Sequence, residues 1–187
     1  MNHHSTTPPE AVLALANPVL TLAYGETAYS KQVENTALSW QDFVDSLSTP
    51  AEGQKDGRYF MRGGCNGPRR DENMTGAGLI VLDGDNGIDT DTGELTPDIA
   101  PPLQDVSAVL DELGVAYVAW TTYSTGELID ESSNDPVEKY KWRVCIPLTD
   151  EASNQWMACQ DWALQQLADR GLAINKGSEM LSYSQPW

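Results

Sequence analysis

The feature that most constrains the fold of this chain is a continuous apolar run that ends in two aspartates. Leu79–Leu82 contains no polar residue, and Asp83, Gly84 and Asp85 follow at once. An apolar run without alternation is typical of a strand buried on both faces, so other elements must cover the sheet on each side. Because side chains alternate along a strand, Asp83 and Asp85 are expected on the same side of it.

Periodicity elsewhere predicts the elements around this strand. Strands are predicted at 19–24, 58–62, 116–123, 140–148 and 180–183, helices at 39–47, around 106–113 and at 154–170, and loops at 86–102 and 124–138. From residue 79 onward this is the order β-α-β-β-α-β of the split, ferredoxin-like unit. The sequence therefore predicts an α+β fold in which an RRM-like palm sheet packs with helices and follows a small N-terminal α/β module.

The length of 187 residues favours one domain. We expect a flexible N-terminal arm over 1–17 and a single domain over 18–187, with the N-terminal module at 18–70 and the palm module at 71–187. The apolar stretch at 11–20 is interrupted by Asn17 and Pro18 and is too short for a membrane span, so a cytoplasmic protein without membrane contact is expected. Three widely spaced cysteines do not predict a disulfide framework.

Charge is distributed unevenly along the chain. The formal net charge is −17, and sixteen acidic but no basic residues lie between Asp71 and Glu138. Eight of the eleven basic residues gather in two short segments, namely Lys55, Arg58, Arg62, Arg69 and Arg70, and Lys139, Lys141 and Arg143. A long phosphate track requires many cations, so tight nonspecific binding of duplex DNA is disfavoured. Each basic segment is still sufficient to hold one nucleotide or a short single strand.

Asp83 and Asp85 are the strongest candidates for a chemical site. Paired carboxylates at a strand end suit a hard divalent ion, Mg²⁺ or Mn²⁺, which takes oxygen ligands and shares them with substrate phosphates. The alternative is a solvated Asp-Gly-Asp turn, because these residues are common in turns. The local pattern leaves both interpretations open.

Five segments together carry a resemblance to a known family. They are YFMRGGCNGPRR (59–70), LIVLDGD (79–85), WTTYSTG (120–126), KYKWRVCIPL (139–148) and SYSQPW (182–187). Over residues 18–187 the chain resembles the primase-polymerase domain of the archaeo-eukaryotic primase superfamily, as found in phage and plasmid replication proteins. The resemblance implies metal-dependent nucleotidyl transfer from nucleoside triphosphates, on a single-stranded nucleic-acid template, in the cytoplasm of a bacterial host.

The resemblance also implies roles for individual residues. Asp83 and Asp85 match the Asp-x-Asp motif that binds Mg²⁺ or Mn²⁺. Tyr123 stands in the slot of the family's phosphate-binding histidine, and Glu179 is the candidate for a third acidic ligand. Since a tyrosine cannot act as a cation, the sequence leaves open whether the chain is catalytically active.

Basic residues complete this nucleotide-binding hypothesis. Arg143 would hold a phosphate as a fork and Lys141 as a point charge. Arg62, Arg69 and Arg70, with the glycine-rich loop between them, are further candidates for contacts with the triphosphate or the template.

A hypothesis of a different class fits the acidity of the chain. A noncatalytic relative would use an acid-rich face to imitate nucleic-acid phosphates and bind a basic protein partner, as an inhibitor of a host defence nuclease of the anti-CRISPR or anti-restriction type. The residues of that face would be Asp89, Asp91, Glu94 and Asp98.

Overall fold

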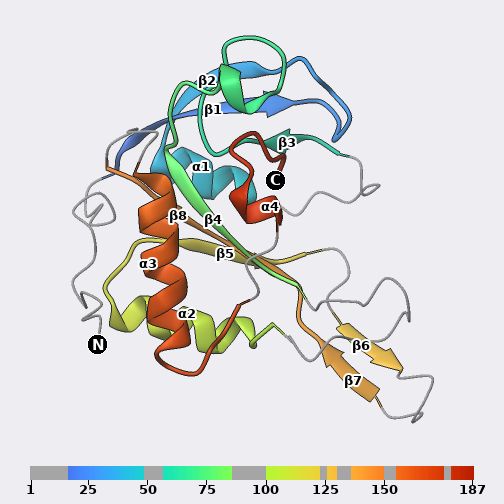
Figure 1. The fold of residues 1–187 in the computed structure, drawn as a ribbon, viewed down its shortest axis with the longest axis vertical. Coiled ribbons are helices and arrows are strands. Elements are labelled where there is room, and N and C mark those ends of the chain that lie inside the picture. The colour runs from blue at the N-terminus through green and yellow to red at the C-terminus, as the bar shows by residue number, and fades with distance from the viewer. Residues whose placement is uncertain are drawn as a thin grey trace.

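The computed structural model describes residues 17–48, 57–85, 100–122, 126–129, 136–149, 155–174 and 178–187, with only the backbone described at 126–129, 136–139 and 178–179. These residues form an α+β fold with two three-stranded antiparallel sheets and a β-hairpin (Figure 1). The elements are β1 (Val19–Gly25), β2 (Glu34–Ser39), α1 (Trp40–Leu47), β3 (Tyr59–Phe60), a 3-10 turn (Asp71–Asn73), β4 (Leu79–Gly84), α2 (Leu103–Glu112), β5 (Val118–Thr121), β6 (Gly126–Ile129), β7 (Pro136–Lys139), β8 (Trp142–Pro147), α3 (Trp156–Ala168) and α4 (Ser178–Leu181).

The sheet that contains the aspartate strand has the order β4-β8-β5. Strand β8 is antiparallel to both neighbours, so it lies between β4 and β5, which the helix α2 connects. This is the split β-α-β arrangement that the order of elements predicted. Its register places Asp83 opposite Arg143, and Arg143 opposite Trp120.

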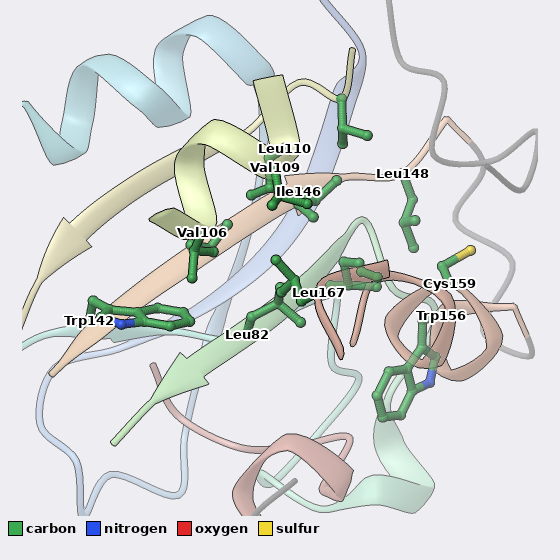
Figure 2. Close-up of a cluster of buried hydrophobic side chains, with 14 of the residues drawn as sticks. Leu82, Val106, Val109, Leu110, Trp142, Ile146, Leu148, Trp156, Cys159 and Leu167 are labelled. Atoms are coloured by element: carbon green, nitrogen blue, oxygen red, sulfur yellow. The ribbon is translucent and has the colours of Figure 1, made fainter. Parts of the chain in front are cut away.

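The β4-β8-β5 sheet is covered on both faces, as the apolar run required. One face packs on α2 and α3 through a core that is drawn in Figure 2 and includes Leu82, Leu110, Trp142, Ile146 and Leu167. The other face packs on the N-terminal module through a second core, whose buried members include Leu20, Phe43, Phe60, Val81 and Cys145. Adjacent residues of β4 therefore enter different cores, and Asp83 belongs to the face of Val81.

The N-terminal module is the sheet β2-β1-β3 with the helix α1. The predicted start of α1 is confirmed, because Ser39 and Asp42 form a capping box in which each side chain accepts a hydrogen bond from the other residue's backbone N–H. Strand β2 was not predicted. It is an edge strand whose first four residues are exposed, so it shows no apolar alternation in the sequence.

Two predicted elements are wrong. A strand was expected at 180–183, but the backbone forms the short helix α4 there. A loop was expected over 124–138, but β6 and β7 form an antiparallel hairpin that extends away from the rest of the protein beyond the ends of β5 and β8 (Figure 1). In the described part of the chain no helix is both long and apolar enough to cross a membrane.

Gly84, between the two aspartates, is explained by packing. A Cβ at this position would lie 2.2 Å from the indole of Trp142, which is the residue opposite it on β8. Trp142 is fully buried, and its indole Nε1 donates a hydrogen bond of 2.8 Å to the carbonyl oxygen of Pro101. The glycine therefore makes room for a core tryptophan directly beneath the candidate site.

We expect Gly84→Ala to lower the free energy of unfolding by about 2–3 kcal/mol, because the added methyl group overpacks a rigid core. Urea denaturation of the wild type and the variant measures this loss. The matched test is the double variant Gly84→Ala/Trp142→Leu, which should cost less than the sum of the two single variants, since the smaller leucine removes the clash. Simple additivity of the two losses would contradict the packing explanation.

Candidate functional site

Two ion pairs lie side by side where β4 and β8 end. Arg143 Nε donates to Asp83 Oδ1 at 3.0 Å, and Lys141 Nζ donates to Asp85 Oδ2 at 2.5 Å. Asp83 and Arg143 face each other across the strand register. The second pair lies just beyond the strands, because Asp85 follows the end of β4 and Lys141 precedes the start of β8. The structure therefore brings these four residues together in a site of two carboxylates and two cations.

The guanidinium of Arg143 is held from two sides. Its Nε contacts Asp83, and its Cζ lies 5.2 Å from the ring centroid of Trp187. Its two terminal nitrogens, Nη1 and Nη2, make no hydrogen bond to the residues that the structure describes. The side chain of Arg143 is 27% exposed, so this pair of nitrogens forms a fork of the kind that binds a phosphate oxygen pair.

A C-terminal segment, residues 178–187, packs against the site. The backbone N–H of Asp83 donates to Met180 Sδ at 3.4 Å, and Trp187 exchanges two backbone hydrogen bonds with Phe60 of β3. Ser184 N donates to the carboxylate of Asp71 at 2.8 Å. Sequence reasoning did not assign Met180 or Trp187 to the site. The last residues of the sequence are rich in apolar and aromatic side chains. This content was interpreted as a strand, whereas in the structure Trp187 lies against Arg143.

Arg62 is not part of an exposed nucleotide-binding loop, contrary to expectation. It is 0% exposed, and its Cζ lies 4.0 Å from the ring centroid of Trp156 and 5.6 Å from that of Trp187. Its Nη1 donates to Gln160 Oε1, and its Nη2 donates to the carbonyl oxygen of Met180. Burial lowers the pKa of the Arg62 guanidinium to about 10, so it stays charged at neutral pH. We call this cluster the arginine cage; it fastens residues 178–187 to α3.

Arg69 and Arg70 do not lie with the aspartates. Arg69 donates to the carbonyl oxygen of Ala28 and lies over the ring of Tyr59, while exposed Arg70 pairs with Glu72. Figure 1 shows their loop beside β1 and β2, whereas β4 runs away from it toward its carboxyl end. Their loop thus lies apart from Asp83, and a contact of Arg69 or Arg70 with the triphosphate or the template stays a prediction.

The glycines that precede these arginines serve close packing. A Cβ on Gly63 would lie 1.5 Å from the carbonyl oxygen of Gly76, so the two backbone segments cross in contact. The carbonyl oxygen of Gly63 accepts from Ala23 N, and that of Gly64 accepts from Thr75 N. Three backbone N–H groups of the loop already donate within the protein, Cys65 N to Asn35 Oδ1, Asn66 N to Asn73 O and Arg69 N to Lys31 O, so these donors are not available to a phosphate.

Several predicted site residues lie outside the part of the chain that the structure describes. These are Tyr123, the side chain of Glu179, and the acidic residues of the mimic hypothesis, Asp89, Asp91, Glu94 and Asp98. Their roles stay predictions.

A hollow of about 810 Å³ lies elsewhere, along β1, β2 and the loop at 67–68. Its lining includes Lys31 and Arg58 but also Glu26 and Glu34, and Arg58 already pairs with Glu26 at 3.6 Å. The lining contains none of Asp83, Asp85, Lys141 and Arg143, so this hollow is separate from the two ion pairs at β4 and β8.

The donor set at Asp83 and Asp85 fits a divalent ion that is shared with a phosphate ligand. Mg²⁺ is commonly held by one or two carboxylates, with substrate oxygens and water completing its coordination. Within the described residues no group of three or more His, Cys, Asp or Glu side chains is arranged to hold a metal ion alone. The two carboxylates therefore suit a metal ion that arrives with a phosphate ligand better than one held by protein only.

We expect Arg62→Ala to lower the free energy of unfolding by about 3–5 kcal/mol, because it leaves a cavity and removes hydrogen bonds from buried acceptors. Arg62→Met should cost less, since an apolar chain of similar length refills the space. Chemical denaturation measures both. The control is Arg58→Ala, whose exposed ion pair with Glu26 is worth about 0.5 kcal/mol or less. An equal loss for Arg62→Ala and Arg58→Ala would contradict a structural role of the arginine cage.

Comparison of the chain with known protein families, with curated proteins and with solved structures finds no match. The function is therefore argued from the geometry of the site together with the motifs in the sequence. The two observations that matter are the paired carboxylates at the end of a buried strand and the arginine fork beside them.

Proposed function

We propose that the chain is a primase-polymerase-like domain and that the ends of β4 and β8 bind a nucleoside triphosphate together with Mg²⁺ or Mn²⁺. The observation that carries the proposal is the pair of adjacent ion pairs, Asp83 with Arg143 and Asp85 with Lys141. Each pair consists of a carboxylate, which is a ligand for a metal ion, and a cationic side chain, which is a ligand for a phosphate. One small area therefore offers both kinds of ligand to a metal-bound triphosphate.

Each residue has a distinct role in this proposal. Asp83 and Asp85 would hold the divalent ion, which supplies charge neutralisation of the triphosphate and activation of an attacking hydroxyl. Arg143 presents its terminal nitrogens to phosphate oxygens, while its Nε and the ring of Trp187 fix the plane of the guanidinium. Lys141 adds a positive charge without a fixed direction.

The surrounding fold supports precise placement of these groups. Asp83 and Arg143 belong to strands whose hydrogen-bonded register is continuous over six residue pairs. Beneath Gly84 lies the fully buried Trp142, and above Arg143 lies Trp187, which is 6% exposed. Catalytic groups on packed strands are held more accurately than groups on loops.

The proposal predicts that Asp83→Asn weakens binding of a metal-bound triphosphate at least about tenfold, or about 1.4 kcal/mol. Asparagine keeps the shape of the side chain and one acceptor for Arg143 but removes the charge that a divalent ion requires. The measurement is calorimetric titration of the protein with Mn²⁺ and a nucleoside triphosphate that carries a nonhydrolysable α,β-methylene bridge.

The matched control for this titration is Asp105→Asn. Asp105 is an exposed carboxylate in the first turn of α2, and its replacement removes the same charge from the protein without touching the site. This variant should bind as the wild type does. Extension of a primer on a single-stranded template with Mn²⁺ then tests nucleotidyl transfer. Absence of binding by the wild type at millimolar ligand would overturn the proposal.

A further inference from the structure

Strand β2 is the outer strand of the N-terminal sheet. The sheet has the order β2-β1-β3, so β1 is the only described strand that pairs with β2. The first four residues of β2, 34–37, are exposed. Natural edge strands are commonly guarded by lysine, proline or a bulge, because their unpaired N–H and C=O groups can bind a further strand. The sequence ENTALS of β2 contains neither lysine nor proline, and its pairing with β1 runs without a bulge over six residue pairs.

The hydrogen bonds of β1 show which backbone groups of β2 point outward. Ala23 lies opposite Asn35 in the register, but its N–H donates to Gly63 O and its carbonyl oxygen accepts from Met61 N, on the side of β1 that faces away from β2. Bonded and non-bonded pairs alternate along an antiparallel ladder. Asn35 and Ala37 therefore direct their N–H and C=O groups away from β1, toward the outer edge.

These four outward groups make no hydrogen bond to the part of the chain that the structure describes. Asn35 uses its side chain instead, since Oδ1 accepts from Cys65 N at 2.9 Å and Nδ2 donates to Cys65 O at 3.2 Å. The next outward position is Ser39, whose N–H donates to Asp42 Oδ2 and so closes that end of the edge. The two donors and two acceptors of Asn35 and Ala37 form the pattern to which an extended peptide adds as a strand.

The hollow of about 810 Å³ lies beside this edge, because Glu34 and Thr36 of β2 line it together with Tyr24 of β1. Side chains alternate along a strand, so those of Glu34 and Thr36 lie on the opposite face of the sheet from Asn35. A peptide paired with the edge places every second side chain on that same face, next to the hollow. In this mode of recognition, backbone pairing supplies affinity and an adjacent pocket selects side chains.

Charge favours a basic peptide at this edge. The charged residues that line the hollow are Glu26, Lys31, Glu34 and Arg58, of which Glu26 and Arg58 pair with each other at 3.6 Å. Glu34 is exposed, forms no ion pair with another described residue and belongs to β2 itself, whereas Lys31 lies before the start of the strand. The formal net charge of −17 attracts cationic segments and repels a second copy of the chain.

We propose that the outer edge of β2 is a docking surface for an extended segment of another protein that carries basic side chains. The segment pairs with Asn35 and Ala37 as a fourth strand of the N-terminal sheet, and one of its basic side chains lies against Glu34. Figure 1 shows β2 at the end of the protein opposite to the β6–β7 hairpin. The surface contains none of the four ion-paired residues at β4 and β8, so the inference does not depend on the proposed function.

The probe is a blocked peptide of sequence TKVKVKT, in which valine and threonine favour a strand and the lysines share one face. In ¹⁵N-labelled protein we expect the amide hydrogens of Asn35 and Ala37 to exchange quickly with solvent when the protein is alone. Saturating peptide should slow this exchange at least about tenfold. Fluorescence anisotropy of the labelled peptide measures its affinity. The acidic peptide TEVEVET should bind at least about tenfold more weakly, because its charges meet Glu34 and the negative protein.

Variants of β2 distinguish strand addition from general attraction between charges. Ala37→Pro removes an outward donor but no bond of the β1–β2 ladder, so the protein should stay folded while its affinity for TKVKVKT falls at least about tenfold. Ala37→Val is the matched control, because it keeps the N–H and should bind as the wild type does. Glu34→Gln should lower the affinity about threefold at low salt, and added salt should reduce this difference. Circular dichroism melting verifies that each variant is folded.

Four outcomes would overturn the proposal. The first is absence of binding of TKVKVKT at millimolar concentration, and the second is equal affinity of wild type and folded Ala37→Pro. The third is slow exchange of the Asn35 and Ala37 amides in the monomer without peptide, which would mean that the chain covers its own edge. The fourth is a concentration-dependent dimer in analytical ultracentrifugation that Ala37→Pro abolishes, which would make a second copy the occupant.

Discussion

The pairing of β8 between β4 and β5 is the constraint on which the rest of the structure depends. It places Arg143 beside Asp83 and requires both faces of the sheet to be covered, one by α2 and α3 and the other by the N-terminal module. Because the central strand cannot shift by one residue without moving every side chain to the wrong core, the register of the candidate site is fixed by burial. The site is thus positioned by two cores that contain no part of it.

Cations are used in two different ways on this face of the sheet. Arg62 is fully buried; its Nη1 and Nη2 donate to an amide oxygen and a carbonyl oxygen, its guanidinium lies by two tryptophan rings, and its Nε has no hydrogen-bond partner among the described residues. Its contribution is to hold residues 178–187 in place. Arg143 also lies near the ring of Trp187, but it is paired with a carboxylate and partly exposed. The ring of Trp187 thereby links a structural arginine to the arginine that we propose for phosphate binding.

Periodicity and apolar content predicted β4, α2, β5, β8 and α3, because these elements bury a regular stripe or a continuous run. The edge strand β2 and the β6–β7 hairpin were missed. Strand β2 is mostly exposed and is defined by its pairing with β1, so it shows no apolar alternation. The helix α4 replaced an expected strand, and α4 is only four residues long. A segment of this length is too short for the spacing of its apolar residues to distinguish a helix from a strand.

The sequence by itself determined that two carboxylates follow a doubly buried strand and that Lys141 and Arg143 lie on a later strand of the same sheet. Local pattern is enough for this, because alternation and burial are encoded residue by residue. Only the tertiary structure decided that Arg143 pairs with Asp83, that Trp187 covers it, and that Arg62 is buried. Such contacts join segments up to about a hundred residues apart, and their geometry depends on strand register and core packing, which no local pattern records.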